Sequence, residues 1–166
     1  NEELFLKYSQ EFIFNIYQLN QNFNQKKNIV IEQGGNFLNP ISSTKYYGKN
    51  RKIIFVSRDP KAIFWSMKRR NSLSYPGNDV IIFVEWYNNL IKKINKQEFK
   101  DIIKINFENF FENFDKQKDF LADSLQIDYE NTNNFDLNFT MKNLYKYRDN
   151  LTKEEILYID KNINEY

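Results

Sequence analysis

The chain has 166 residues, of which 41% are hydrophobic and 17% aromatic, and it carries a formal net charge of +2 with no cysteine and no histidine. This length and apolar content predict one folded domain over residues 1–166 and exclude a disordered chain. The small net charge permits an anionic ligand without indicating a nucleic-acid partner, and the lack of cysteine excludes disulfides and thiolate chemistry.

The N-terminal third of the chain is predicted to contain a helix, a strand and a loop. Residues 2–23 predict an amphipathic helix, because apolar side chains such as Tyr8 and Phe12 recur on one stripe. The short apolar run Asn28–Glu32 predicts a buried strand. Residues 33–50 hold three of the four glycines and predict a loop.

The rest of the chain alternates between short apolar runs and longer periodic runs. The predicted elements are, in chain order, a buried strand at 52–57, a helix at 60–69, a loop at 71–77, a helix at 79–95, a strand at 101–106, a helix at 115–125, a loop at 128–138 and a helix from Thr152 to about 164. Thr152 and Glu155 fit a capping box. Strands separated by helices predict an α/β sandwich with a mainly parallel sheet.

No apolar run approaches the length of a membrane span, and no signal peptide opens the printed sequence. The sequence leaves the location open, with the cytoplasm as the default expectation. The chain starts with Asn1 rather than Met, which predicts that it is a piece of a longer protein.

The segment around Arg58 is the most informative part of the sequence. Arg58 follows the predicted strand at 52–57, Pro60 suits the first position of a helix, and Ser66 comes about two turns into that helix. Arg58 is therefore expected at the carboxyl end of a strand and beside a helix N-terminus, where α/β sheets bind anions. Its guanidinium suits a phosphate. The alternative is that Arg58 only forms a salt bridge with a neighbour.

This arrangement, Arg58-Asp59-Pro60-Lys61 with Ser66, resembles the 3′-phosphate-binding segment of the sulfotransferases that use 3′-phosphoadenosine 5′-phosphosulfate (PAPS). In that family the strand ends in an Arg-x-Pro-basic pattern, and a serine eight residues after the arginine completes the site. The resemblance implies that Arg58 and Ser66 bind PAPS as co-substrate, with no metal. It also implies a P-loop-NTPase-like three-layer sandwich with a mainly parallel sheet.

Three later stretches follow the order of elements in the same family. The helix with Trp86-Tyr87 resembles its aromatic-rich helix, and Ile102–Asn109 resembles its strand ending in Tyr-Glu-Asp, with Phe120-Leu121 in the following helix. Residues 145–155 resemble its C-terminal Trp-Arg…Leu-Ser-x-Glu-Glu pattern. Glu108 is expected to pair or cap near the sheet edge and is not predicted to be a site residue.

The chain also departs from the family. It has no phosphosulfate-binding loop of the Pro-Lys-Ser-Gly-Thr-Thr type, because Gly34-Gly35 precedes no Lys-Ser or Lys-Thr pair, and the C-terminal Arg-Lys-Gly triplet is absent. We therefore expect residues 1–166 to be the C-terminal portion of a sulfotransferase domain that lacks its N-terminal strand and phosphosulfate loop.

The resemblance implies transfer of a sulfuryl group from PAPS to an acceptor hydroxyl or amine, with a carbohydrate as the default expectation for the acceptor. With no histidine, a base must be a carboxylate, lysine or tyrosine. The catalytic residue stays unassigned. Glu32, at the end of a predicted strand, is a candidate, and a salt bridge is its alternative role.

Other polar and aromatic side chains have ordinary explanations as well as functional ones. Lys68-Arg69-Arg70 is typical of a helix C-terminus, where cations are favourable, and Trp86-Tyr87 is typical of a core. Lys146 and Arg148 either close over the nucleotide or face solvent.

Two other classes of protein stay open. One is a non-catalytic α/β interaction domain or fragment that retains only binding of the nucleotide 3′-phosphate. The other is a fragment of a P-loop-like phosphotransferase. The sequence upstream of Asn1 distinguishes these classes, because a Pro-Lys-Ser-Gly-Thr motif supports a sulfotransferase and a Walker-type Gly-Lys-Ser supports a phosphotransferase.

Overall fold

The structure is a computed structural model that describes residues 1–19, 29–32, 36, 38–48, 50–70, 74–96, 102–129 and 136–163. The chain divides into two compact units, residues 1–53 and residues 54–166. The single domain predicted over residues 1–166 stays a prediction.

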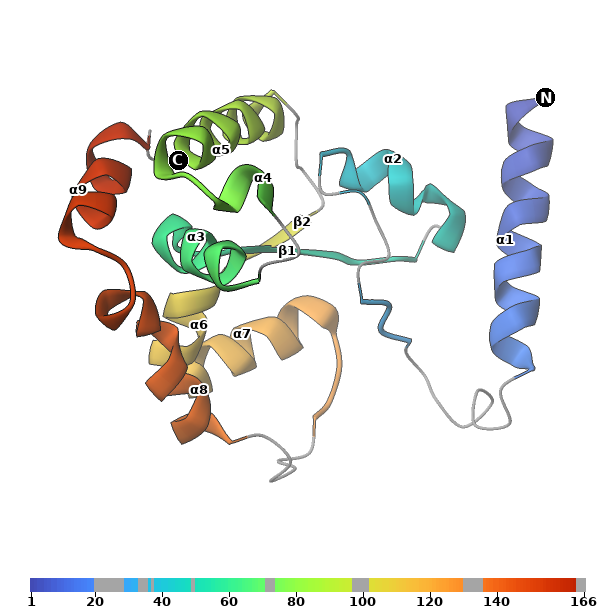
Figure 1. Cartoon of the computed structure of the whole chain (residues 1–166). Coiled ribbons are helices and arrows are strands. Elements are labelled where there is room, and N and C mark those ends of the chain that lie inside the picture. The colour runs from blue at the N-terminus through green and yellow to red at the C-terminus, as the bar shows by residue number, and fades with distance from the viewer. Residues whose placement is uncertain are drawn as a thin grey trace. The chain divides into compact units, whose positions relative to one another are not determined.

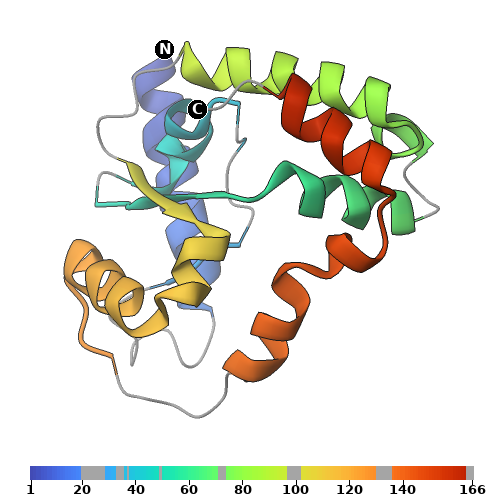
Figure 2. The same ribbon diagram turned by 90° about the vertical axis from the view of Figure 1, so that its left-hand side faces the viewer.

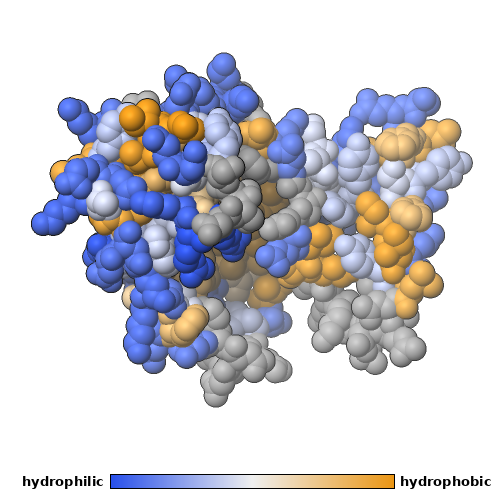
Figure 3. Space-filling model, viewed as in Figure 1, coloured by the Kyte–Doolittle hydropathy of each residue, from blue (hydrophilic) through white to orange (hydrophobic). Residues whose placement is uncertain are grey.

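The first unit is built around one amphipathic helix. Its elements are α1 (Glu2–Gln18), α2 (Pro40–Thr44) and the 3₁₀ helix η2 (Lys45–Tyr47). α1 packs on η2 through an edge-to-face contact between Phe5 and Tyr46, whose ring centroids are 6.2 Å apart, and through an ion pair of 2.6 Å between Lys45 Nζ and Glu2 Oε1. The helix predicted over residues 2–23 is thus confirmed to Gln18, and residues 20–23 lie outside the described part. Much of the apolar surface of α1 is exposed (Figure 3).

The structure corrects two predictions in the first unit. Residues 29–32, the described part of the strand predicted at Asn28–Glu32, form no strand, and Val30 is 92% exposed. A β-branched run needs a hydrogen-bonded partner strand, and none pairs with these described residues. The loop predicted at 33–50 contains α2, which begins at Pro40 because the Asn39 side chain accepts a hydrogen bond from the Ser42 N–H (3.3 Å).

The second unit combines helices with a small parallel sheet, which makes it α/β (Figure 1). Its elements in chain order are β1 (Ile53–Ser57), α3 (Pro60–Arg69), α4 (Ser74–Gly77), α5 (Val80–Asn95), β2 (Ile102–Asn106), α6 (Phe107–Glu112), α7 (Phe114–Leu125), α8 (Leu137–Leu144), the 3₁₀ helix η3 (Lys146–Asp149) and α9 (Lys153–Asn162). Among the described residues the sheet has two strands, β1 and β2, where three had been predicted.

The strands place their carboxyl ends at the same edge of the sheet. β1 leads directly toward α3, and β2 continues into α6 (Figures 1 and 2). The strand predicted at 52–57 is confirmed, but it is not buried throughout, because side chains alternate across a strand. Ile54 and Val56 are exposed, whereas Phe55 points to the more covered face.

The core of the second unit lies between helices on one side of this edge. Its fully buried large side chains are Phe64 on α3, Phe83 on α5, Leu144 on α8 and Ile159 on α9. The ring centroids of Phe64 and Phe83 are 5.0 Å apart. α3, α5 and α9 contact one another, as Figure 2 shows, so the helix that follows β1 is held firmly against the core.

Local capping explains where most of these helices begin. The Asp79 carboxylate accepts hydrogen bonds from the N–H groups of Ile81 (2.7 Å) and Ile82 (3.2 Å) at the start of α5. The predicted capping box at Thr152 and Glu155 is confirmed.

Three further helices were not predicted. α4 lies within the loop predicted at 71–77, although Tyr75 inside it is not helical (φ −119°, ψ 134°). α6 begins immediately after β2, because the Asn106 side chain accepts a hydrogen bond from the Asn109 N–H (2.8 Å). α8 begins within the loop predicted at 128–138, where the Asp136 side chain accepts a hydrogen bond from the Phe139 N–H (2.9 Å). α6 and α8 are each capped by a residue type that favours helix starts.

Candidate functional site

Arg58 lies between the end of β1 and the start of α3. The Asp59 carboxylate caps α3 by accepting a hydrogen bond from the Lys61 N–H (2.8 Å), and Pro60 takes the first helical position. Asp59 and Pro60 together therefore define the start of α3. The helix must begin one residue after Asp59, so Arg58 is held at the carboxyl end of the strand, as predicted.

Glu108, in the first turn of α6 directly after β2, holds this turn in place. Its Oε2 accepts hydrogen bonds from the Asp59 N–H (3.1 Å) and from the Asn106 side chain (3.5 Å). Only 7% of Glu108 is exposed. The predicted role of Glu108 in pairing near the sheet edge is thus confirmed, and it ties the ends of β1 and β2 together.

The Arg58 side chain is supported on one side and open on the other. Its Nε lies 3.9 Å from Glu108 Oε1, and its guanidinium carbon lies 5.0 Å from the centre of the Phe107 ring. Neither the buried Nε nor the buried Oε1 has a hydrogen-bond partner among the described residues. The Arg58 side chain is 33% exposed. The salt bridge considered as the alternative role of Arg58 is therefore present, but it is long and involves only Nε.

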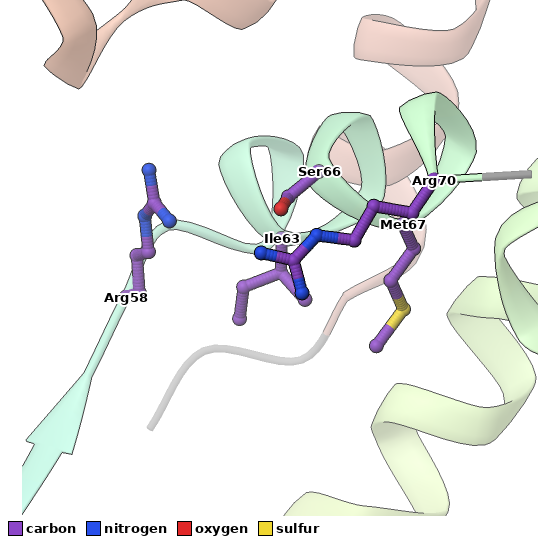
Figure 4. A pocket seen from close by; sticks show the side chains of 5 residues that line it. All are labelled: Arg58, Ile63, Ser66, Met67 and Arg70. Atoms are coloured by element: carbon purple, nitrogen blue, oxygen red, sulfur yellow. The ribbon is translucent and has the colours of Figure 1, made fainter. Parts of the chain in front are cut away.

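Arg58 and Ser66 line one open pocket of about 190 Å³ (Figure 4). Ile63, Met67 and Arg70 complete its lining. The serine hydroxyl points into this pocket from α3. No hydrogen bond of that hydroxyl is found in the described part of the chain, whereas Ser9 on α1 donates to the Phe5 carbonyl in the ordinary manner of a helical serine (2.8 Å). Ser66 therefore presents a hydroxyl that is available to a ligand.

Arg70 is a pocket residue that the sequence analysis assigned only to the basic end of a helix. Figure 4 shows its side chain reaching back along α3 toward Ser66 and Arg58. The spacing of Ile63, Ser66, Met67 and Arg70 could have indicated this, because residues three, four and seven apart share one face of a helix. The described lining of the pocket thus combines two guanidinium groups, one hydroxyl and two apolar side chains, and it contains no carboxylate.

A second pocket, of about 250 Å³, lies on another side of the same turn. Arg58 lines this pocket as well, and the other polar residues in its lining are Ser57, Asp59, Lys61, Asn106 and Asp160. Lys61 Nζ lies 2.5 Å from Asp160 Oδ1 and 3.6 Å from Asp59 Oδ1. Burial acts to lower the pKa of Lys61, but the hydrogen bond to Asp160 and the nearby carboxylates raise it overall. The basic residue of the Arg-x-Pro-basic pattern is therefore neutralised within the protein.

The remaining candidates lie elsewhere. Tyr87 is buried and Trp86 packs near it in the aromatic core, as predicted for a structural role. Arg148 stacks on the Tyr145 ring, with its guanidinium carbon 4.2 Å from the ring centre, and Lys146 is exposed. Glu32 lies in the first unit, where it is exposed and, contrary to prediction, does not end a strand.

The described residues contain no group of three or more His, Cys, Asp or Glu side chains arranged to hold a metal ion. Within the same residues, none of the helices has both the length and the apolar content needed to cross a membrane.

Comparisons with family models, with curated proteins and with solved structures each give no significant match. The pocket at Arg58 must be interpreted from its own chemistry. Two guanidinium groups and a free hydroxyl around one open cavity are suited to an anion with several oxygen acceptors, such as a phosphate.

Proposed function

We propose that this chain is a nucleotide-binding α/β domain of the PAPS-dependent sulfotransferase type, in which Arg58 and Ser66 bind the nucleotide 3′-phosphate. The observation that carries the proposal is that Arg58, at the end of β1, and Ser66, about two turns into α3, line the same pocket. The finer fold, a three-layer sandwich of the P-loop type, is part of the proposal. The two-stranded parallel sheet is compatible with the broader α/β class.

The structure of the turn supports a phosphate site in particular. Glu108 Oε1 lies 3.9 Å from Arg58 Nε, and the guanidinium carbon lies 5.0 Å from the centre of the Phe107 ring. This arrangement leaves the two terminal nitrogens of Arg58 as hydrogen-bond donors, which match two oxygens of one phosphate. The Ser66 hydroxyl supplies a further donor from another direction.

In the proposed reaction, an acceptor hydroxyl or amine attacks the sulfur of PAPS, the bond from sulfur to the bridging oxygen of the 5′-phosphate breaks, and a base removes the acceptor proton. Arg58 and Ser66 position the nucleotide through its 3′-phosphate and do not contact the reacting sulfur. The catalytic base stays unassigned, and a carbohydrate remains our expectation for the acceptor.

Calorimetry tests the proposed binding. Adenosine 3′,5′-bisphosphate should bind, and adenosine 5′-monophosphate, which lacks the 3′-phosphate, should bind more weakly. Arg58→Ala should weaken binding of the bisphosphate by about 1.5–3 kcal/mol, the range for hydrogen bonds to charged groups. Arg69→Ala serves as a matched control, because Arg69 stacks on Trp65 and does not line the pocket. Equal affinity for the two nucleotides would contradict the proposal.

A second candidate is a non-catalytic domain that retains nucleotide binding. It is favoured by the sequence, which contains no histidine and no loop of the Pro-Lys-Ser-Gly-Thr-Thr type. An assay with radiolabelled PAPS and a panel of carbohydrate acceptors separates the two candidates. Binding of the bisphosphate without sulfuryl transfer by the full-length gene product supports the second.

A further inference from the structure

The basic cluster at the end of α3 consists of three residues with different environments. Lys68 Nζ forms an ion pair of 2.5 Å with Glu155 Oε1 on α9, and the Arg69 guanidinium carbon lies 5.2 Å from the centre of the Trp65 ring. These two cations have structural partners. For the Arg70 side chain, by contrast, no ion pair or hydrogen bond is found across the described ranges of the chain.

The backbone explains why Arg70 differs from its neighbours. It is the C-cap of α3, with φ of −88° and ψ of 92°, so the chain leaves the helix at this residue. Its N–H still donates to the Met67 carbonyl (3.1 Å), which anchors its Cα to the last turn. The side chain then runs back along the face that carries Ser66, away from the last carbonyls of the helix (Figure 4). The Arg70 guanidinium is therefore not held by a favourable interaction with the C-terminus of α3.

We propose that Arg70 is a second anion-binding side chain of this pocket, and that together with Arg58 it makes the pocket selective for a phosphomonoester in its dianionic form. The inference rests on the proposed function, because it concerns the ligand of the same pocket. The negative charge of Glu108, 3.9 Å from Arg58 Nε, partly cancels the positive charge of Arg58. Arg58 alone therefore attracts an anionic ligand less strongly than an unpaired guanidinium would. Arg70 supplies the charge that matches the second negative charge of the phosphate.

The lining residues strengthen this selectivity. Ile63 and Met67 form the apolar part of the pocket, so Arg58 and Arg70 are the charged residues in its described lining. None of the described lining residues is acidic, and Glu108, which lies 3.9 Å from Arg58 Nε, is not among them. A phosphodiester or a sulfate ester carries only one negative charge and should bind less well.

Adenosine 3′-monophosphate is the appropriate probe, because it carries a single phosphomonoester at the proposed position. Arg70→Ala should weaken its binding about tenfold at pH 7.5, as for the loss of one exposed charge-assisted contact. Arg70→Lys should recover part of the loss, and Arg69→Ala should leave the affinity unchanged.

The pH profile tests the charge argument directly. The second pKa of a phosphomonoester is about 6, so the affinity of the natural chain should fall as the pH is lowered from about 7.5 to 5. Because Arg70 interacts with the second charge, Arg70→Ala should show a shallower fall over the same interval. A purely structural role of Arg70 would shift the affinity without flattening the profile.

The outcomes distinguish the two proposals. If Arg58→Ala weakens binding of adenosine 3′-monophosphate but Arg70→Ala has no effect on its affinity or pH profile, the role of Arg70 is overturned and the proposed function stands. If neither variant affects binding, or if the probe does not bind the folded natural chain, the proposed function fails together with the role of Arg70.

Discussion

Replacing Glu108 by alanine tests how the turn that carries Arg58 is held in place. Glu108 is buried, its Oε2 accepts the Asp59 N–H (3.1 Å), and its Oε1 lies 3.9 Å from Arg58 Nε. The substitution removes an acceptor from a partly buried backbone donor and also removes the counter-charge of Arg58. The two effects differ in size, and the structure indicates which one is larger.

Loss of the hydrogen bond should account for most of the decrease in the free energy of unfolding. A hydrogen bond to a charged group contributes about 1.5–3 kcal/mol to stability. The ion pair should contribute about 0.5–1 kcal/mol, because Arg58 Nε and Glu108 Oε1 are too far apart for a hydrogen bond and the Arg58 side chain keeps 33% of its exposure. We expect Glu108→Ala to lower the free energy of unfolding by about 2–4 kcal/mol. Glu108→Gln, which keeps an acceptor oxygen, should cost about 1 kcal/mol.

Urea denaturation followed by tryptophan fluorescence measures these changes. Both tryptophans of the chain, Trp65 on α3 and Trp86 on α5, belong to the second unit, so the signal reports the unit that contains Glu108. A double-mutant cycle with Arg58→Met isolates the ion pair and should give a coupling energy of about 0.5–1 kcal/mol. A cost below about 1 kcal/mol for Glu108→Ala, or a coupling energy above about 2 kcal/mol, would refute this reasoning.

Three further predictions concern the core, a helix cap and a tyrosine. Phe64→Ala should destabilise the second unit by about 3–5 kcal/mol in the same urea assay, because Phe64 is fully buried, and a cost below about 2 kcal/mol would contradict its place in the core. Asp79→Ala should cost about 1–2 kcal/mol, since two N–H groups at the start of α5 lose their acceptor, whereas Asp79→Asn should cost less. The hydrogen bond to Glu112 raises the pKa of Tyr145 to about 12, so its stabilising effect is complete below the ordinary value near 10 and is lost as the pH rises from about 10 to 12. Ultraviolet titration of Tyr145→Phe should lack the phenol that ionises near pH 12, and an unchanged titration curve would exclude the assignment.

Local sequence signals predicted α3, α5, α7 and α9 of the second unit. α3 runs from Pro60 to Arg69, the range predicted for it, because an aspartate cap and a proline at the first position define its start. The capping box at Thr152 likewise located the start of α9. These signals depend on residues within one helical turn of each other, and so they can be recognised without knowledge of the fold.

The predictions failed where the outcome depends on distant parts of the chain or on weak local signals. The run Asn28–Glu32 has strand-like side chains, but its described residues have no partner strand. Pairing between strands is decided by the whole sheet, so propensity alone cannot establish it. α2 begins with the Asn-Pro signal at Asn39, but glycines on both sides of it favoured a loop.

For the candidate site, the sequence by itself determined the position of Arg58 at a strand end and the placement of Ser66 on the following helix, because a strand end, a cap and a helical rise are local properties. Only the tertiary structure decided that Glu108, which is 49 residues from Asp59, closes the turn by accepting its N–H. It also decided which cation of the basic cluster has no ion pair or hydrogen bond among the described residues. Lys68 forms an ion pair with Glu155, and Arg69 lies over the Trp65 ring. The helix ends at Arg70, and the Arg70 side chain lines the pocket.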